Sequence, residues 1–298
     1  MSLLDSIQSL LKDPPPEFAF EISASGIAMS RTRGPATIQY TSLPDGVLVP
    51  SPIKENITDI PAFTAAVRKL VPATGGRRSA ALILPDNAMR LTVFEFDNIP
   101  EKEEERQALV RFRLKKTVPF EVETAAVSYY VQPGNKVVVA VTPAEIITQY
   151  EAPFRAAGLQ PGIVTPAALT LLDLLPSTGS YLVAHQNSGA LAVLVVGNGV
   201  LTLSRSLEQT LVSEDTLDEI VSDLYATRVY VEDQAGARPD RLYLAGFGAE
   251  SQFFMDRLAK ELDVRVEVIP DDYPGLAGYL RSLSSSARSA QPARKVAA

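Results

Sequence analysis

Hydrophobic and polar positions along the chain follow two different periods, and the changes of period mark the predicted elements. After the prolines at 14–16, apolar-rich segments at 18–23, 27–31 and 36–43 predict three short strands joined by glycine-containing turns. The spacing then becomes that of a helix over 61–70, and another strand is predicted over 79–84. The opening part of the chain therefore has the order βββαβ.

The same order returns in the second half. Asn198 and Gly199 predict a tight hairpin within it, because both residue types accept the positive φ that such turns require. A chain that repeats βββαβ predicts two similar lobes with a cleft between them, where ligands usually bind. The second set consists of strands at 181–185, 191–196 and 200–205, a helix at 213–228 and a strand at 241–244.

A unit with a different pattern separates the two halves. A strand over 89–96 leads to a helix opened by Ile99-Pro100, with glutamates in its first turn and basic residues toward its end, which complements the helix dipole. Two strands and two helices that begin at Thr142-Pro143 and Thr165-Pro166 follow, the former with the pattern of a capping box. The expected domains are a first lobe (17–83 plus 159–178), an inserted unit (84–158) and a second, reduced lobe (179–280).

Both ends of the chain have patterns of their own. Leu3, Leu4, Ile7, Leu10 and Leu11 share one face of a short amphipathic helix within 1–16, which ends at a proline spacer. The sequence leaves open whether this helix packs on its own domain, on a second copy, on a membrane or in a partner's groove. The run 281–298 is basic, rich in Ser and Ala and free of acidic residues, so we expect a disordered tail.

Composition excludes several classes of function. The 298 residues contain no Cys and a single histidine, His185, so thiolate and histidine-rich metal sites are excluded. The 28 basic and 35 acidic residues give a net charge of −7. A nucleic-acid-binding protein normally has a positive electrostatic field, so this class is disfavoured. No apolar run reaches the ~20 residues of a membrane-spanning helix, and no signal peptide is evident. We therefore expect a cytoplasmic protein.

Seven short motifs of the inserted unit and the segment after it form a recognisable set. They are Leu84-Pro85-Asp86, Thr92-Val93-Phe94-Glu95-Phe96, Ile99-Pro100, Val118-Pro119-Phe120-Glu121, Tyr129-Tyr130-Val131, Gly158-Leu159-Gln160-Pro161 and Pro166-Ala167-Ala168-Leu169. This set resembles the PilM family of type IV pilus assembly proteins, which are actin-like proteins related to FtsA. The resemblance is clearest over 84–175 and implies an α/β fold of the actin-like, RNase H-like type, with duplicated βββαβα lobes and an FtsA/PilM-type inserted subdomain.

The resemblance also implies where a nucleotide would bind, and the loops there depart from the family pattern. Glu21 and Ser23, followed by Ser25, stand where the first phosphate loop of the family has Asp and Gly. His185 and Asn187 replace the corresponding residues of the second loop. Gly246-Phe247-Gly248 is similar to the adenosine loop, although a lone Gly-x-Gly is weak evidence. We expect these seven positions, Glu21, Ser23, Ser25, His185, Asn187, Gly246 and Gly248, to form a degenerate nucleotide cleft without cofactor, metal or catalytic residues.

Three functions are compatible with this pattern. The first is a non-catalytic scaffold at the inner face of the inner membrane, which binds the cytoplasmic tail of a PilN-like membrane protein within the pilus assembly complex. The second is an active actin-like ATPase that binds ATP and Mg²⁺ through Glu21, and the third is a secretion scaffold of the GspL type. The family places the tail-binding groove between the first lobe and the inserted unit, which suggests Phe112, Val118, Pro119, Phe120 and Tyr130, although each is equally explained as core.

Overall fold

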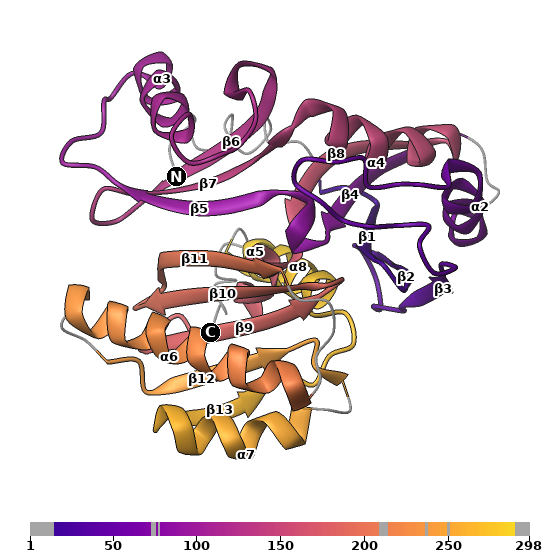
Figure 1. Cartoon of the computed structure of the whole chain (residues 1–298). Helices are drawn as coiled ribbons and strands as arrows, with labels where there is room; N and C mark the ends of the chain where they lie inside the picture. The colour runs from indigo at the N-terminus through magenta and orange to yellow at the C-terminus, as the bar shows by residue number, and fades with distance from the viewer. Residues whose placement is uncertain are drawn as a thin grey trace, which may run out of the picture.

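The computed structural model describes residues 15–72, 76, 78–208, 214–235, 238–248 and 251–289, which form three β-sheets with helices packed around them (Figure 1). Two of the sheets have five strands each, and the third has three. The amphipathic segment expected within 1–16 lies almost wholly outside the described residues. Among the described helices, none combines the length and apolar character needed to cross a membrane.

The first sheet has the strand order β3-β2-β1-β4-β8. β1, β2 and β3 are antiparallel neighbours, whereas β4 and β8 run parallel to β1. The carboxyl ends of β1, β4 and β8 therefore meet at one edge of the lobe. These strands are β1 (Phe18–Ser23), β2 (Gly26–Arg31), β3 (Gln39–Ser42), β4 (Arg78–Leu84) and β8 (Leu159–Pro166).

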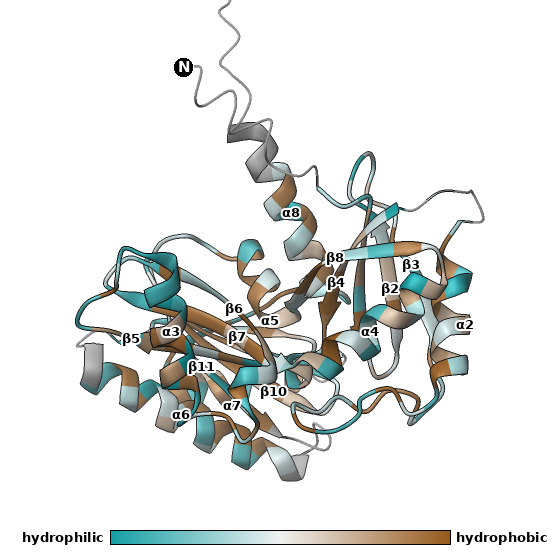
Figure 2. Cartoon of the chain, turned by 90° about the horizontal axis from the view of Figure 1, so that it is seen from above, coloured by the Kyte–Doolittle hydropathy of each residue, from teal (hydrophilic) through white to brown (hydrophobic). Residues whose placement is uncertain are grey.

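Helices cover both faces of the first sheet. On one face, α2 (Ile60–Leu70) and α4 (Ala144–Ala156) contribute Phe63, Tyr150 and Phe154 to the core, and these side chains are fully buried. The other face packs against α5 (Ala167–Leu171) and α8 (Pro274–Ser289). Figure 2 shows apolar colour along the strands and hydrophilic colour on the outer faces of the helices, as expected for helices that bury one stripe.

The second sheet repeats the topology of the first, with the order β11-β10-β9-β12-β13. Asn198 and Gly199 have positive φ in the β10–β11 hairpin, as the sequence predicts. α6 (Glu214–Ala235) and α7 (Ser251–Leu262) cover its outer face. The strands are β9 (Ser180–Asn187), β10 (Ala190–Gly197), β11 (Val200–Glu208), β12 (Arg241–Ala245) and β13 (Arg265–Val268).

The duplication is longer than the sequence pattern predicts. Each half continues after βββαβ with a further helix, strand and helix: α4, β8 and α5 in the first half, and α7, β13 and α8 in the second. β8 was not anticipated because Pro161 and Gly162 interrupt its apolar pattern, and a register irregularity lies beside them. β13 has only four residues, so its alternation is too short to stand out.

The inserted unit is a three-stranded antiparallel sheet with the order β5-β7-β6. α3 (Glu103–Leu114) packs on one face through Val110 and Leu114, and the opposite face contributes Leu91, Val93 and Val138 to a core shared with the second lobe. Among the described strands, β6 pairs with β7 alone, so in this part of the chain its other edge is free. The strands are β5 (Arg90–Glu95), β6 (Ala125–Gln132) and β7 (Lys136–Pro143), and short 3₁₀ turns occupy 86–88, 122–124 and 172–174.

Three local expectations differ from the structure. Thr142 does not cap α4, because its hydroxyl donates to the Ala88 carbonyl at 2.9 Å and the cap position is Pro143. α4 packs into the core of the first lobe rather than that of the inserted unit. The run from Arg281 is not a disordered tail throughout, because α8 continues to Ser289 and the Arg281 guanidinium donates to the Leu174 carbonyl at 3.1 Å. Residues 290–298 lie outside the described residues.

Candidate functional site

A cavity of about 390 Å³ lies between the two lobes, at the carboxyl ends of β1 and β9. The first lobe, the second lobe and the segment that leads into α8 all contribute to its wall. Six of the seven residues expected at a nucleotide cleft line it, and Gly248 does not. The lining residues are Glu21, Ser23, Ala24, Ser25, Tyr40, His185, Gln186, Asn187, Ser188, Gly246, Asp272, Tyr273 and Pro274.

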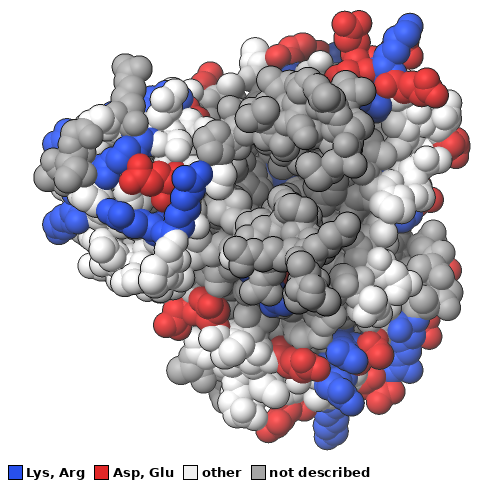
Figure 3. All heavy atoms as spheres, turned by 180° about the vertical axis from the view of Figure 1, so that it is seen from behind, with Lys and Arg blue, Asp and Glu red and all other residues white. Residues whose placement is uncertain are grey.

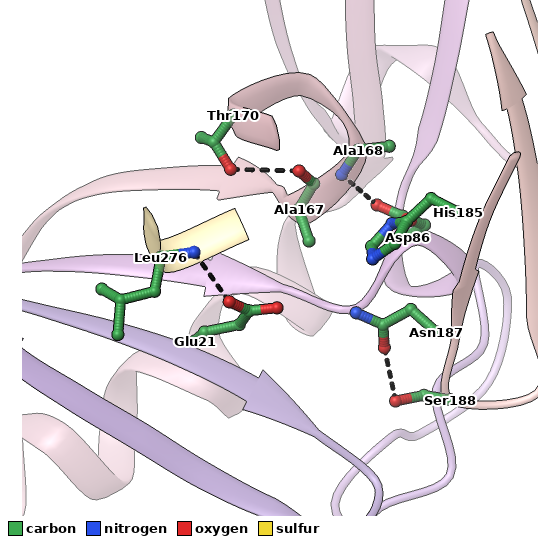
Figure 4. Close-up of polar contacts among 9 residues, drawn as sticks. All are labelled: Glu21, Asp86, Ala167, Ala168, Thr170, His185, Asn187, Ser188 and Leu276. Carbon is green, nitrogen blue, oxygen red and sulfur yellow. Dashed lines mark hydrogen bonds and ion pairs between the residues drawn. The ribbon is translucent and has the colours of Figure 1, made fainter. Parts of the chain in front are cut away.

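Glu21 lies near the end of β1 and is only 5% exposed. One carboxylate oxygen, Oε2, accepts a hydrogen bond of 2.7 Å from the Leu276 amide in the first turn of α8 (Figure 4). Burial raises the pKa of Glu21 to about 7, although the Leu276 amide and His185 act in the opposite direction. The carboxylate that the resemblance assigns to Mg²⁺ is therefore engaged with the amino end of a helix.

A buried ion pair joins the lobes beside Glu21. Asp86, immediately after β4, accepts a hydrogen bond from His185 on β9, with 2.6 Å between Oδ2 and Nδ1. Its other oxygen accepts from the Ala168 amide at 2.7 Å, in the first turn of α5 (Figure 4). Burial alone would lower the pKa of His185, but the Asp86 carboxylate, with Glu21 also contributing, raises it above its ordinary value.

Sequence reasoning did not assign Asp86 to the site, although it noted the motif that contains it. An acidic residue two positions after a strand whose last five residues are buried is the signal that was available. What the sequence lacks is a link to His185, which is 99 positions away and belongs to the other lobe. The geometry shows that two carboxylates, Glu21 and Asp86, cap the first turns of α8 and α5, the equivalent helices of the two halves.

The two loops that would cradle phosphates contact each other directly. The Ala24 amide of the first loop donates to the Ser188 hydroxyl of the second at 2.9 Å. Ser188 in turn donates to Asn187 Oδ1 at 2.6 Å, and the hydroxyls of Ser23 and Ser25 are 3.0 Å apart. Backbone amides in such loops normally point at an anion. Here the Ala24 amide is already satisfied by a neutral side chain.

Packing accounts for one of the two glycines of the segment that is similar to an adenosine loop. Gly246 has φ of +77°, and a Cβ there would lie 2.1 Å from the Gln186 carbonyl oxygen, so only glycine fits. Gly248 has φ of +55° and open space around it. Phe247 points into the second lobe, where its ring lies 5.2 Å from that of Phe254. The backbone of this loop therefore packs directly against the second phosphate loop at Gln186.

The charge of the cavity wall is acidic. Glu21 and Asp272 line it, and none of the described lining residues is Lys or Arg. Within the described part of the chain, no group of three or more His, Asp or Glu side chains is arranged to hold a metal ion. The wall can donate hydrogen bonds from hydroxyls and amides, but apart from His185 it offers no cationic group to an anion.

A second region of interest follows the free edge of β6. One small cavity of about 170 Å³ lies beside Ala126, Val127 and Ser128, and Val164 of β8 bounds it on the first-lobe side. A larger cavity of about 700 Å³ lies beside Tyr130 and Gln132 of the same strand, with Leu169 and Leu172 opposite. We call these two cavities together the β6 groove; it separates the inserted unit from the chain that connects the lobes.

Gln132 fixes the inserted unit to the second lobe at the end of this groove. Its side-chain amide donates to the Leu201 carbonyl at 2.9 Å and accepts from the Leu201 amide at 3.0 Å. The pair imitates one rung of a β-ladder. The wall of the groove therefore has a defined position relative to both lobes.

The five residues that the sequence suggested for partner binding lie in different environments. Val118 and Phe120 belong to the core of the inserted unit, and Pro119 beside them is exposed. Phe112 is 59% exposed on α3, with the Lys116 ammonium 5.5 Å from its ring. Only Tyr130 lines the β6 groove. The other groove residues of β6 and β8 were missed because short apolar strands give no sign of which edge stays free.

Comparison with known proteins places these features in a structural context. No family model matches the chain. No curated protein matches it in sequence. Among solved structures, the PilM–PilN type IV pilus biogenesis complex matches with a TM-score of 0.74 and 17% identity, over 94% of this chain and 100% of that one.

Two further structures match with a TM-score of 0.54. One is a Bacteroides thetaiotaomicron protein with an actin-like ATPase fold and unknown function, at 15% identity over 88% of this chain and 94% of that one. The other is the cytoplasmic domain of EpsL, an inner-membrane component of the Vibrio cholerae type II secretion system, at 12% identity over 90% of this chain and 94% of that one. The fold class predicted from the sequence is confirmed: the chain has the actin-like fold, in the arrangement seen in the PilM structure.

Proposed function

We propose that this protein is a non-catalytic scaffold of a type IV pilus or related secretion machine, and that it binds the cytoplasmic tail of a PilN-like membrane protein in the β6 groove. The observation that carries the proposal is that polar groups of the cleft are already paired within the protein. Glu21, Asp86 and the Ala24 amide are each engaged by groups of the protein itself, with the contacts to Leu276, His185 and Ser188 described above.

Magnesium nucleotide does not fit the residues present. A triphosphate needs converging donors to offset the loss of its hydration. The described residues of the cavity wall offer hydroxyls and one imidazole, and none of them is Lys or Arg. One of the two Glu21 carboxylate oxygens already accepts from the Leu276 amide. The actin-like fold then serves as a rigid frame rather than as an ATPase.

The β6 groove supports the second part of the proposal. An unpaired strand edge offers backbone donors and acceptors to an extended peptide, and flanking cavities can accept its side chains. The groove has both features, because no described strand pairs with the outer edge of β6, and cavities lie near each end of it. The partner is suggested by the PilM structure, whose solved complex contains PilN. Membership of the pilus assembly complex and a cytoplasmic location at the inner membrane follow from this proposal.

Calorimetric titration with a synthetic PilN-like amino-terminal peptide tests the proposal. We expect a Kd of about 100 μM or tighter. Ala126→Glu and Tyr130→Ala, one near each end of the groove, should each weaken binding at least about tenfold. Phe112→Ala is the matched control, because Phe112 is exposed on α3 and lines neither cavity. Absence of binding, or equal losses in the groove and control variants, would contradict the groove assignment.

A titration of the same protein with Mg-ATP tests the alternative of an active ATPase. We expect no heat of binding up to millimolar nucleotide. Micromolar binding that Glu21→Ala removes would establish the ATPase alternative instead. The likeness to the EpsL domain keeps a GspL-type secretion scaffold as a second candidate. Binding of a secretion-system peptide in the same groove, with no binding of the PilN-like peptide, would favour it.

A further inference from the structure

The wall of the cavity between the lobes offers hydrogen-bond acceptors and negative charge. Glu21 contributes a buried carboxylate and Asp272 an exposed one. The side-chain oxygen of Gln186, another residue of the wall, is buried and accepts no hydrogen bond from the described part of the chain. The charge of His185 is balanced by Asp86, whose Oδ2 lies 2.6 Å from Nδ1. An occupant of this cavity therefore faces acceptors whose net charge is negative.

The acidic character is a property of the cavity rather than of the surface as a whole. Figure 3 shows Lys and Arg interspersed with Asp and Glu over the part of the outer surface that it displays. The whole chain has 28 basic residues against 35 acidic ones, so cations are only slightly fewer than anions. In the cavity, by contrast, none of the described lining residues is Lys or Arg.

Two tyrosines complete the wall beside these acceptors. Tyr40 of β3 and Tyr273, which precedes α8, have ring centroids 5.6 Å apart. The Tyr40 hydroxyl donates to the Ser25 carbonyl at 2.7 Å, and the Tyr273 amide donates to Asp271 Oδ1 at 2.9 Å. The faces of aromatic rings attract organic cations, and a planar guanidinium also stacks on them. Carboxylates and aromatic rings in one wall are a combination that suits such a cation.

Contacts within the protein hold this wall in place before any ligand binds. The Ala24–Ser188 hydrogen bond of 2.9 Å joins the loops of the two lobes. Figure 4 shows Oε2 of Glu21 directed at the Leu276 amide, while the other oxygen points away from it, to the side on which Asn187 lies. A volume of about 390 Å³ falls within the range of small-molecule sites. A preformed site of this kind avoids the cost of ordering its side chains on binding.

We propose that this cavity binds a small organic cation, with an alkylguanidinium as the best match, between the carboxylates of Glu21 and Asp272 and against the rings of Tyr40 and Tyr273. The forked donors of a guanidinium match carboxylate oxygens in pairs. A metal ion is a poorer match, because no group of three His, Asp or Glu side chains in the described residues is arranged to hold one. An anion would be repelled by both carboxylates. The inference goes beyond the scaffold function and does not depend on the β6 groove.

Calorimetric titration of the full chain with butylguanidinium at pH 8 tests the proposal. The pKa of Glu21 is about 7, so its carboxylate is ionised at this pH. We expect a Kd of about 1 mM or tighter. N-butylurea has nearly the same shape without the charge, and should bind at least about tenfold more weakly. Equal binding of the two compounds, or no binding of butylguanidinium, would overturn the proposal.

Variants of the wall locate the binding. Glu21→Gln and Asp272→Asn should each weaken it at least about fivefold, and Tyr273→Leu should weaken it as well. Asp256→Asn is the matched control, because it removes one negative charge at an exposed position of α7 outside the cavity. Circular dichroism verifies folding, and exposed Asp272 keeps the test decisive if Glu21→Gln fails to fold. Equal losses in Asp272→Asn and Asp256→Asn would contradict a local site.

A guanidinium can belong to a free metabolite or to an arginine side chain of a partner protein. A capped Gly-Arg-Gly peptide, titrated in the same way, distinguishes the two sources. Tighter binding of butylguanidinium supports the proposal with a free cation as the ligand, and tighter binding of the peptide supports it with an arginine side chain. Because neither compound resembles the PilN-like peptide or a nucleotide, failure here is separate from failure of the scaffold proposal.

Discussion

Glu21, Asp86 and His185 form a cluster of buried ionisable side chains. All three are more than nine-tenths buried, and they come from β1, the end of β4 and β9. Buried charges cost free energy unless each is paired and hydrogen-bonded. Asp86 meets this condition through His185 and the Ala168 amide, which makes the pair sensitive to the loss of either partner.

Removal of one member of the pair should therefore cost more than removal of both. We expect His185→Gln to lower the free energy of unfolding by about 3 kcal/mol, because it leaves the Asp86 carboxylate without its charged partner. Adding Asp86→Asn to that variant should recover part of the loss. Urea unfolding of the two single variants and the double variant measures the coupling; additive losses would show that the pair contributes no coupling energy.

Protonation of Glu21 and His185 gives the stability a defined pH dependence. The folded-state pKa of Glu21 is about 7, against an ordinary value of 4.5, so the folded state holds the proton more tightly than the unfolded state. The stabilisation from this proton is complete below about pH 4.5 and is lost as the pH rises toward 7. His185 changes the stability in the same direction. Its pKa is raised in the folded state, so the stability that its proton contributes is lost as the pH rises through that folded-state pKa.

Glu21→Gln isolates this contribution. Glutamine can still accept from the Leu276 amide but does not ionise, so the variant should match the unaltered protein near pH 5. At pH 8 we expect the variant to be more stable, by up to about 3 kcal/mol, because the unaltered protein must then hold a buried carboxylate. Thermal unfolding of both proteins between pH 5 and pH 8 tests this prediction. A difference in stability that stays the same across this pH range would contradict the raised pKa of Glu21.

At the scale of elements, α5 and α8 determine how the lobes meet. α8 begins beside the cleft and then follows α5, with Gly275 against Ala167 and Gly278 against Thr170. A Cβ at position 278 would lie 2.0 Å from the Thr170 carbonyl oxygen. The two helices therefore approach backbone to backbone at this point, as small residues allow.

This close approach reverses the usual effect of alanine in a helix. In an open helix Gly→Ala gains up to about 1 kcal/mol. Gly278→Ala should instead destabilise the protein by more than about 2 kcal/mol, because α8 must shift away from α5. Ser284→Ala, at an exposed position of the same helix, is the matched control and should be near neutral. Chemical denaturation compares them, and a stabilised Gly278→Ala protein would contradict the packing.

The elements and their duplication could be predicted largely from periodicity, whereas the contacts between lobes could not. Strong alternation and Asn198-Gly199 gave the strands of both sheets, but β8 is interrupted by proline and glycine and β13 is very short. In the cleft, Glu21, His185 and Gly246 were placed by the resemblance of their motifs to the loops of the PilM family. Their partners were not, because the Leu276 amide is 255 positions from Glu21 and no local rule connects them.

At the scale of the whole molecule, hydrogen bonds join the two lobes across the cleft. The lobes would have to break these bonds in order to open or close around a nucleotide. The Ala24–Ser188 and Asp86–His185 hydrogen bonds cross the cleft directly, and Gln132 fixes the inserted unit to the second lobe. The relative position of the lobes is thereby defined by the chain itself.

The overall shape should accordingly not respond to nucleotide. We expect small-angle X-ray scattering curves of the protein with and without millimolar Mg-ATP to superimpose. A variant with Asp86→Ala and His185→Ala, if folded, should show a broader distribution of interatomic distances, because one cross-cleft link is gone. Contraction of the unaltered protein on addition of Mg-ATP would show that the lobes still close around a ligand.

The hydrogen bond between Glu21 and Leu276 also has a consequence for synthesis on the ribosome. The first lobe begins with β1, yet the face formed by Ala19, Ala28 and Ala81 is covered by α8, which follows the strands of the second lobe in the chain. This lobe therefore cannot be completed until α8 has been synthesised, however early its strands pair. Until then the nascent chain exposes the apolar face that α8 covers.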